Sequence, residues 1–341
     1  MKVIVFDAKK YDIKTFGKAN NHENDLLFIT GRLTAKSVHR AEGYEAVCTF
    51  VNCKVDAEVL DRLSELGVKT IFQRSAGYNN IDLVHAEKLG IQVYRVPAYS
   101  PEAVAEYALT LLMSLNRNVH ISYLRTSQKN FSLEGLQGDT IFGQTIGVLG
   151  AGRIGLNFIR AANGLGAEVI VYDEYARENF PNIAEEHNFT FVDKEEFFKS
   201  SDYVSLHAPL LPSTKYIINK ETLALMKPSA IIVNTSRGGL INTEDLLWAL
   251  DHGHLRGAGL DVYEHEEGVF FFDRSNDLIP DQLLNRMRAH RNVILTSHQA
   301  FFTNLALKQI AETTMDNIQL SLAGDLGTTG LKIEGDRVIN G

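Results

Sequence analysis

The sequence has little cysteine, no long apolar run and no basic cluster, and each absence excludes a class of protein. The two cysteines, Cys48 and Cys53, cannot form a four-cysteine zinc site, and a disulfide is unusual in a reducing compartment, so both are expected to be packing residues. No apolar run approaches the roughly 18 residues of a membrane helix, and the start MKVIVFD lacks the apolar core of a signal peptide. These absences predict a cytoplasmic protein.

The charge balance narrows the choice of partner. The net charge is −8, and lysines and arginines are not clustered, which argues against nucleic acid or an anionic membrane as the main partner. Hydrophobic residues make up 45% of the chain and charged residues 22%, enough apolar material for packed interiors. Basic residues that bind an anion must therefore act singly, inside a site, and a small-molecule substrate is expected.

Apolar runs alternate with helical segments along the chain, which predicts α/β architecture in two domains. The first series of runs is KVIVFD (2–7), EAVCTFV (45–51), VKTIFQR (68–74) and IQVYRV (91–96). After a long helix at 99–118, a second series follows: TIGVLG (145–150), AEVIVYD (167–173), DYVSLHAP (202–209), AIIVNTSRG (230–238), GAGLDVY (257–263) and NVILTSHQA (292–300).

The second series is apolar enough to be buried on both faces, so we predict a doubly wound parallel sheet in the larger domain. Only one helical segment, 303–324, and a glycine-rich polar tail follow it. This remainder is too short for a domain and is expected to pack on the N-terminal domain. The predicted boundaries are 1–99 with 299–341 for one domain and 100–298 for the other.

The stretch GAGRIG (150–155) follows a predicted strand and opens a predicted helix, the setting of a dinucleotide-binding loop. Gly150, Gly152 and Gly155 permit a tight turn and close approach to a pyrophosphate, whose charge meets the helix N-terminus. Asp173 ends the next strand, where it can bind ribose hydroxyls and repel a 2′-phosphate. The sequence therefore predicts NAD rather than NADP as cofactor.

Polar side chains end five runs of the second series, at the edge where open α/β sheets bind ligands. They are Asp173, His207 with Pro209, Arg237, Asp261 and His298. Arg237 can grip a carboxylate through two hydrogen bonds, although an ion pair with a surface acid is the alternative. His298 is the acid-base candidate because histidine ionises near neutral pH, whereas a packed structural ring is the alternative. For His207, a cofactor-crevice position and a packed neutral ring are equally open.

The stretch GLDVYEHEEG (259–268) is open to three interpretations: a charged surface loop, a metal site or part of an active site. No other cluster of hard ligands accompanies it, so no metal is expected. If Glu266 hydrogen-bonds His298, its carboxylate favours the protonated imidazole that a carbonyl reduction needs. Glu264 faces the same way in an extended chain, so spacing alone leaves both glutamates as candidates.

These motifs, in this order, resemble the D-isomer-specific 2-hydroxyacid dehydrogenase family over nearly the whole chain. They are GAGRIG with Asp173, NTSRGG, GLDVYEHE and SHQAF. Four further segments are similar to the fermentative D-lactate branch of that family: SAGYNNID (75–82), VPAYSPEAVAEYA (96–108), NFSLEGL (130–136) and FFFDRSND (270–277). The resemblance implies two Rossmann-like domains, a flavodoxin-like catalytic domain and a larger NAD-binding domain.

The resemblance also implies NADH-dependent reduction of pyruvate to D-lactate and assigns residues to it. Arg237 binds the substrate, His298 is the proton donor, and Glu266 is its partner, which leaves Glu264, His265 and Glu267 as solvated bystanders. Implied cofactor contacts are Arg153, Ile154, Asp173, Ala208, Pro209, Thr214, Thr235, Ser236, Arg237 and Asp261. Implied substrate neighbours are the backbone amides of Ala76, Gly77 and Tyr78, and the side chains of Tyr99 and Phe301.

Two alternatives to pyruvate reduction remain. A dehydrogenase for larger 2-keto acids differs only in pocket volume, and a corepressor-like NAD sensor can keep the same residues. Glycerate and formate dehydrogenases of the family usually have proline after the catalytic glutamate, whereas Glu267 follows Glu266 here, which favours the lactate branch. Family members are homodimers or homotetramers, and the 99–118 helix with the segment after it is the expected interface.

Overall fold

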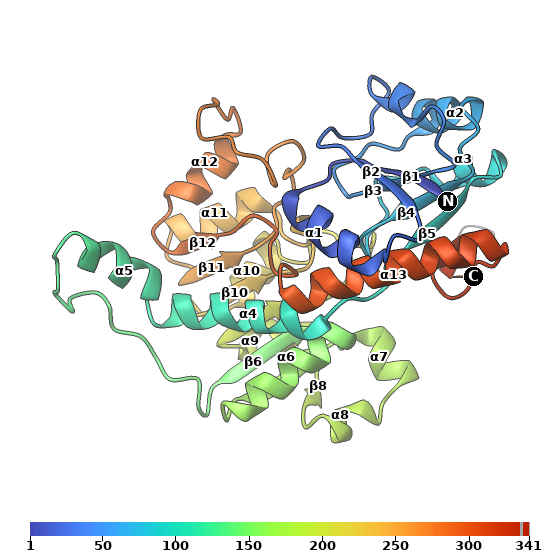
Figure 1. Ribbon diagram of the computed structural model, residues 1–341. Coiled ribbons are helices and arrows are strands. Elements are labelled where there is room, and N and C mark those ends of the chain that lie inside the picture. The colour runs from blue at the N-terminus through green and yellow to red at the C-terminus, as the bar shows by residue number, and fades with distance from the viewer. Residues whose placement is uncertain (335–336, 341) are drawn as a thin grey trace. The chain divides into compact units, whose positions relative to one another are not determined.

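The computed structural model describes residues 1–334 and 337–340, which form two compact units (Figure 1). The small unit consists of Met1–Ser100 together with the chain from Phe302 onward, and the large unit is Pro101–Phe301. Each unit contains one seven-stranded sheet flanked by helices. The predicted fold class, two doubly wound α/β domains, is confirmed.

The sheet of the small unit begins with five parallel strands. In spatial order its strands are β2 (Asp25–Phe28), β1 (Lys2–Val5), β3 (Ala46–Thr49), β4 (Thr70–Gln73), β5 (Gln92–Arg95), β13 (Gly330–Glu334) and β14 (Arg337–Asn340). The order 2-1-3-4-5 is that of flavodoxin-like sheets. Its helices are α1 (Lys10–Ala19), η1 (Val38–Ala41), α2 (Ala57–Glu65), α3 (Leu83–Lys88) and α13 (Asn304–Ala323).

The sheet of the large unit is parallel throughout. In spatial order its strands are β8 (Thr190–Phe191), β7 (Glu168–Tyr172), β6 (Thr145–Leu149), β9 (Tyr203–Leu206), β10 (Ile231–Asn234), β11 (Gly257–Leu260) and β12 (Val293–Leu295). Counted within the unit, this is the dinucleotide-binding order 3-2-1-4-5-6 with one further strand. The strand order reverses between β6 and β9, which is where such sheets bind ligands.

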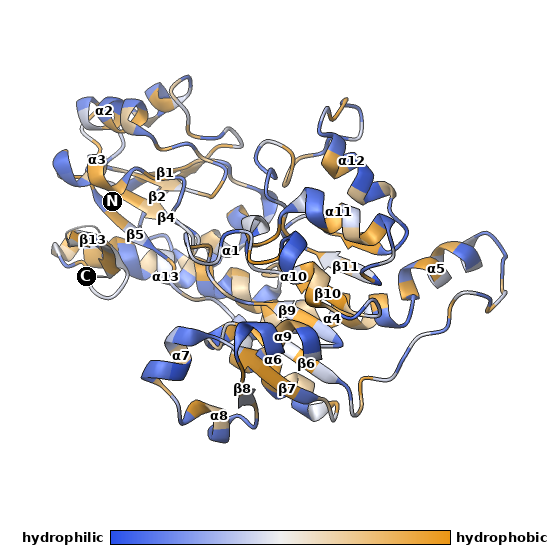
Figure 2. Cartoon of the chain, turned by 180° about the vertical axis from the view of Figure 1, so that it is seen from behind, coloured by the Kyte–Doolittle hydropathy of each residue, from blue (hydrophilic) through white to orange (hydrophobic). Residues whose placement is uncertain are grey.

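Helices cover both faces of the large sheet, and each face has its own apolar core. The helices of the large unit are α4 (Pro101–Asn116), α5 (Val119–Ser127), α6 (Arg153–Gly164), α7 (Glu174–Asn179), α8 (Ile183–Glu186), α9 (Lys194–Ser200), α10 (Lys220–Leu225), η2 (Gly238–Leu240), α11 (Thr243–Asp251) and α12 (Gln282–Ala289), and α5 projects away from the sheet (Figure 1). Figure 2 shows the strands as mainly hydrophobic and the helices as mixed, the pattern of a sheet buried on both faces.

Four strands of the described residues were not expected from the sequence. β2 and β8 are short edge strands, and the burial of β2 alternates instead of being continuous. The tail after α13, expected to be a polar tail, contains β13 and β14, and β13 pairs antiparallel with β5 through Gly330 opposite Tyr94. A short edge strand needs few apolar residues, so its sequence resembles a loop.

Candidate active site

Five predicted site residues follow five strands of the large sheet. Asp173 follows β7, His207 follows β9 and Asp261 follows β11 directly, whereas Arg237 and His298 lie three residues beyond β10 and β12. These strands run parallel in one sheet, so their carboxyl ends lie along one edge. The large unit therefore brings all five residues to the edge at which such sheets bind ligands.

His298 and Glu266 are in direct contact. The Nδ1 atom of His298 lies 2.8 Å from Oε1 of Glu266, and both side chains are partly exposed. The second oxygen of Glu266 accepts a hydrogen bond from the backbone N–H of Tyr263 at 3.1 Å. The carboxylate is thus fixed by its own loop.

The turn that carries His298 is held by the buried carboxylate of Asp261. Its Oδ1 accepts hydrogen bonds from the Thr296 hydroxyl (2.6 Å) and the Gln299 N–H (2.9 Å), and its Oδ2 accepts one from the Ala300 N–H (2.8 Å). Burial raises the pKa of the Asp261 carboxyl, and these hydrogen bonds oppose that rise. The φ angle of His298 is 56°, a left-handed conformation uncommon outside glycine. Asp261 therefore stabilises a strained turn that aims the imidazole.

Glu264 is not the solvated bystander that we expected. Its side chain is only 9% exposed, and its two oxygens accept hydrogen bonds from the Tyr216 hydroxyl (2.8 Å) and the Thr243 N–H (3.0 Å). These partners come from the loop before α10 and the start of α11, so Glu264 ties its own loop to both. Glu264 and Glu266 are close in sequence, but only Glu266 contacts His298. The exposed neighbours His265 and Glu267 agree with the expectation.

Arg237 lies directly before η2 on a turn that packs against the loop of Glu266. Its Nη1 atom donates a hydrogen bond to the Ser236 carbonyl at 2.7 Å, and the residue is half-buried. A Cβ on Gly238 would lie 2.1 Å from the backbone carbon of Tyr263, so only glycine allows this close approach. Glycine at 238 thus permits the Arg237 turn and the Glu266 loop to lie side by side.

The glycine-rich loop between β6 and α6 fits a dinucleotide phosphate. Gly150 has a φ of 96°, and a Cβ on Gly155 would lie 2.0 Å from the Gly150 carbonyl oxygen. A Cβ on Gly152 would meet no described atom within 4 Å, so this side of the loop is open to a ligand. Gly152 caps α6 without a side-chain hydrogen bond. The first N–H groups of the helix, at Arg153 and Ile154, can therefore meet an anion.

Two buried polar atoms at the ends of β9 and β10 have no hydrogen-bond partner within residues 1–334 and 337–340. They are Nδ1 of His207 and Oγ1 of Thr235. The other ring nitrogen of His207 lies 2.8 Å from the Ser205 hydroxyl, and burial lowers the pKa of His207 to about 3. His207 is therefore a neutral ring, packed 5.0 Å from that of Phe158. Unpartnered buried polar atoms are uncommon, and a ligand that supplies hydrogen bonds fits them.

The loop after β9 is joined to the turn after β10. The Ser236 hydroxyl donates to the Ala208 carbonyl at 2.7 Å, and the Thr214 hydroxyl donates to the Pro209 carbonyl at 2.6 Å. These hydrogen bonds fix the shape of the loop. The loop lies close to the glycine loop, since a Cβ on Gly150 would lie 2.9 Å from the Ala208 nitrogen. These hydrogen bonds hold together four predicted cofactor residues, Ala208, Pro209, Thr214 and Ser236.

Asp173 joins β7 to the glycine loop. Its Oδ2 accepts a hydrogen bond from the Ala151 N–H at 2.8 Å, and its Oδ1 caps α7 through the Ala176 N–H at 2.9 Å. The carboxylate therefore lies within hydrogen-bonding distance of the loop that would hold the pyrophosphate. This is the position from which an acid can meet the adjacent ribose.

The predicted substrate segments lie in both units. Ala76–Tyr78 follow β4 and Tyr99 follows β5 in the small unit, whereas the buried Phe301 ends the large unit. The guanidinium of Arg95 lies 5.3 Å from the ring centroid of Tyr78, a cation–π distance.

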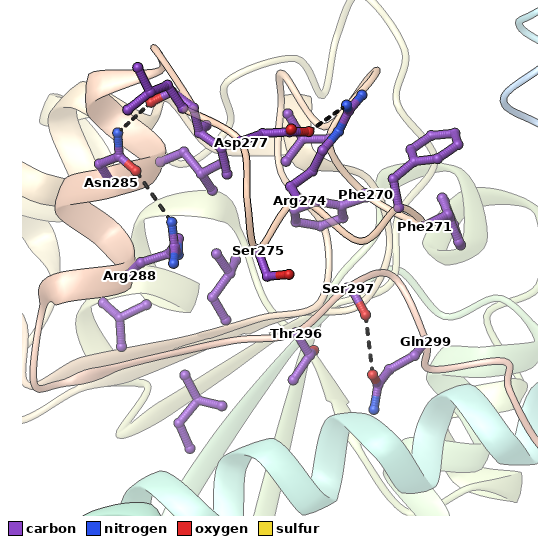
Figure 3. Close-up of a pocket in the computed structure, with 18 of the residues that line it drawn as sticks. Phe270, Phe271, Arg274, Ser275, Asp277, Asn285, Arg288, Thr296, Ser297 and Gln299 are labelled. Carbon is purple, nitrogen blue, oxygen red and sulfur yellow. Dashed lines mark hydrogen bonds and ion pairs between the residues drawn. The ribbon is translucent and has the colours of Figure 1, made fainter.

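A cavity of about 950 Å³ adjoins the His298 turn within the large unit. Figure 3 shows Ser297 and Gln299 on the wall that this turn forms, with Phe271 and Arg274 on the facing loop. The Phe271 ring centroid lies 5.5 Å from that of the His298 imidazole. Phe271 is therefore the aromatic neighbour of the predicted acid-base residue.

Sequence reasoning did not single out three residues that support the site. Thr296 binds Asp261, Phe271 packs beside His298, and Ser205 contacts His207. Thr296 and Ser205 each precede a predicted histidine by two residues, a spacing that places them at the same strand end. No local signal identifies Phe271, because its contact with His298 spans residues distant in sequence.

The described part of the chain contains neither a cluster of metal ligands nor a helix that could span a membrane. No group of three or more histidine, cysteine, aspartate or glutamate side chains in it could hold a metal ion. None of its helices combines the length and apolar character needed to cross a membrane. Cys48 and Cys53 are buried free thiols, and burial raises the pKa of Cys48 to about 12.

Comparison with known proteins identifies the family. The sequence model of the D-isomer specific 2-hydroxyacid dehydrogenase NAD binding domain matches residues 109–300. The D-lactate dehydrogenase of Escherichia coli is 44% identical over 320 residues, covering 93% of this chain and 96% of that protein. Its apo structure superimposes with a TM-score of 0.88 at 40% identity, covering 97% of this chain and 100% of the other.

An NAD-complexed structure gives the same result for a more distant relative. The D-isomer specific 2-hydroxyacid dehydrogenase of Lactobacillus delbrueckii ssp. bulgaricus superimposes with a TM-score of 0.80 at 28% identity, covering 97% of this chain and 100% of that one. The glycine loop and the unpartnered atoms of His207 and Thr235 fit the same cofactor. The chain therefore belongs to the D-isomer-specific 2-hydroxyacid dehydrogenase family of NAD-dependent oxidoreductases.

Proposed function

We propose that this protein is a D-lactate dehydrogenase that reduces pyruvate to D-lactate and catalyses the reverse oxidation. The observation that carries the proposal is the 2.8 Å contact between Glu266 and His298, on a turn whose geometry Asp261 fixes. A carboxylate that holds one imidazole nitrogen leaves the other to exchange a proton with substrate. The relatives named as D-lactate dehydrogenases support the choice of substrate.

Each residue has a distinct role in the proposed reaction. His298 donates a proton to the carbonyl oxygen during reduction and removes it from the hydroxyl during oxidation. Glu266 keeps the imidazole protonated before reduction. The guanidinium of Arg237 binds the substrate carboxylate and polarises the carbonyl oxygen, which its planar arrangement of N–H groups permits.

The nicotinamide cofactor, when bound, supplies the hydride that reaches the keto carbon. The N–H groups at the start of α6 would hold its pyrophosphate, with Gly150, Gly152 and Gly155 allowing close approach. Asp173 would bind the ribose hydroxyls and exclude a 2′-phosphate. Further contacts are proposed for Arg153, Ile154, His207, Ala208, Pro209, Thr214, Thr235, Ser236, Arg237 and Asp261.

Further residues are proposed to contact the substrate. The amides of Ala76, Gly77 and Tyr78 would bind the carboxylate, and Tyr99 and Phe301 would border the methyl group. Aromatic rings at these two positions support a small substrate such as pyruvate.

A substrate panel tests the proposed function. Purified protein should oxidise NADH with pyruvate and yield only the D isomer of lactate. The bulkier 2-keto acids and hydroxypyruvate should be poorer substrates by kcat/KM. Activity confined to those alternatives would assign the enzyme to another branch of the family, and NADH binding without turnover of any 2-keto acid would indicate a sensor.

We also propose that the enzyme works in the cytoplasm as a homodimer or homotetramer. Figure 1 shows α5 and the segment after it extending away from the large sheet. Large apolar side chains there are exposed, including Tyr123 (72%), Phe131 (75%) and Leu133 (82%). Such a patch is typical of an interface, and the mass in solution, measured by light scattering, tests the proposal.

A further inference from the structure

The turn after β4 in the small unit contains peptide groups whose orientation is fixed by buried side chains. The Ala76 carbonyl accepts a hydrogen bond from Nη1 of Arg95 at 3.1 Å. The Gly77 carbonyl accepts two, from the Ser75 hydroxyl at 2.8 Å and from Nε2 of Gln73 at 3.2 Å. Both carbonyl oxygens are therefore held toward the protein by donors on neighbouring residues.

The N–H groups of the same two peptides are left available. In a trans peptide the N–H points opposite to the C=O, so the Gly77 and Tyr78 N–H groups point away from the donors that hold the carbonyls. Within residues 1–334 and 337–340, neither N–H donates a hydrogen bond to another protein atom. Both residues are partly exposed. Two adjacent, partly exposed N–H groups that are not used within the described residues suit an anionic ligand.

Gln73 is the central member of this arrangement. It is 1% exposed, and its Nε2 also reaches the Ser75 hydroxyl (2.8 Å) and Oδ1 of Asn80 (3.0 Å). Its Oε1 accepts a hydrogen bond from the Thr49 hydroxyl at 2.6 Å. If the Gln73 side-chain amide were turned over, its oxygen would face the Gly77 carbonyl oxygen and no hydrogen bond could form. The neighbouring acceptors therefore fix the orientation of this amide.

The network continues from Gln73 into the neighbouring strand. The Nδ2 atom of Asn80 donates to the Phe50 carbonyl (3.2 Å) and the Cys53 carbonyl (3.0 Å), both beyond the end of β3. Gln73 and Asn80 therefore connect the turn to the end of β3 through buried and partly buried hydrogen bonds. Such networks hold a backbone in one conformation.

We propose that Gln73 is a positioning residue for substrate binding, which holds the Gly77–Tyr78 peptide so that the Tyr78 N–H faces the substrate carboxylate. Gln73 acts only through the peptide group, without touching the substrate. This inference rests on the proposed function, because it assumes that the 76–78 amides bind the carboxylate of a 2-keto acid.

The test is Gln73→Leu, which keeps the volume but removes every donor. We expect the KM for the 2-keto acid to rise about tenfold, because the Gly77 carbonyl loses one of its two donors and the Gly77–Tyr78 peptide can then turn. The KM for NADH should stay within about twofold, because Gln73 lies outside the unit that carries the cofactor loop. The Kd of oxamate, an unreactive keto-acid analogue, should rise in parallel with the first KM.

Ser75→Ala provides a milder variant if Gln73→Leu does not fold. It removes one of the two donors to the Gly77 carbonyl and should raise the same KM and oxamate Kd about threefold, less than the loss of a whole hydrogen bond network. Asn20→Leu is the matched control, since it removes another buried amide of the small unit, whose partner in the described part of the chain is Asn24. It should lower thermal stability without raising the keto-acid KM.

The outcomes separate this inference from the proposed substrate. The assays use whichever 2-keto acid the unaltered enzyme reduces fastest, so a preference for another acid contradicts only the choice of pyruvate. If folded Gln73→Leu or Ser75→Ala leaves the keto-acid KM and the oxamate Kd unchanged, the positioning role is wrong. It is also wrong if the KM values for keto acid and NADH rise together.

Discussion

Glu266 contacts one nitrogen of the His298 imidazole, and a substitution can remove the charge of this contact while keeping its hydrogen bond. A carboxylate 2.8 Å from Nδ1 stabilises the protonated ring, and glutamine at that position offers no charge. The proposed mechanism therefore needs the charge of Glu266 as well as its hydrogen bond. In Glu266→Gln the alkaline limit of kcat/KM for pyruvate reduction should move down by about one pH unit or more, as expected for loss of an adjacent opposite charge.

The control for that experiment is Glu267→Gln. Glu267 is an exposed neighbour in the same loop, and its removal changes the net charge by the same amount. It should leave the pH profile where it is. A profile that moves equally in both variants, or in neither, would remove the Glu266 contact from the mechanism.

His207 provides a second test at the residue scale, through stability. Its pKa is lowered by burial to about 3, below the ordinary histidine value of about 6.5. As pH falls below 6.5, the unfolded chain binds this proton before the folded protein does, so the free energy of unfolding decreases down to about pH 3. His207→Gln should weaken this dependence by up to about 1.4 kcal/mol per pH unit, the effect of one proton.

Urea unfolding between pH 7.5 and pH 4.5 measures the effect. His22→Gln, at an exposed histidine, is the control and should follow the unaltered protein. Parallel slopes for His207→Gln and the unaltered protein would show that His207 is not neutral in the folded state.

Glu264 and Glu266 show which properties of single residues the sequence predicts and which it does not. The sequence predicted that polar residues would end five strands, because an apolar strand has no need of them. It did not distinguish Glu264 from Glu266, because the loop after β11 is irregular and the period of a strand does not apply to it. Nor did it show that Glu264 is buried, which depends on Tyr216 and Thr243 approaching from other loops.

At the scale of elements, the junction of β6 and α6 explains how the loop can bind a phosphate. A Cβ on Gly152 meets no described atom, so Gly152→Ala should leave thermal stability nearly unchanged while the new methyl group occupies ligand space. We expect the Kd for NADH to rise about tenfold or more, which corresponds to about 1.4 kcal/mol. Fluorescence titration with NADH measures this effect.

Gly164→Ala is the matched control in the same helix, because a Cβ there also meets no described atom. It should leave the Kd for NADH within about twofold, since it lies at the far end of α6 from the anion-binding terminus. Equal Kd values for the two variants would contradict the position of the cofactor at the start of α6.

Most strands were predictable and the edge strands were not, for one physical reason. β6, β9 and β10 are mainly apolar and buried over almost their whole length because helices cover both faces of the sheet. β2 and β8 have less to bury, so composition does not separate them from loops. The β13 and β14 hairpin depends on pairing with β5, a contact that no local sequence pattern indicates.

At the scale of the whole molecule, cofactor binding should stabilise the protein selectively. A ligand that binds only the folded state at 100 times its Kd adds about 2.7 kcal/mol to stability. NADH should therefore raise the Tm, whereas NADPH at the same concentration should raise it much less, because Asp173 would face its 2′-phosphate. Thermal unfolding followed by circular dichroism measures both, and equal shifts would contradict the assigned position of Asp173.

His298 is proposed to exchange the proton in a reaction that forms D-lactate from pyruvate. The most direct measurement is a single-turnover assay of NADH-loaded His298→Gln with saturating pyruvate. We expect a rate about 10² to 10⁴ times slower than that of the unaltered enzyme, the contribution typical of a general acid, with the Kd for NADH unchanged. A rate within about tenfold of the unaltered enzyme, with D-lactate still formed, would contradict it.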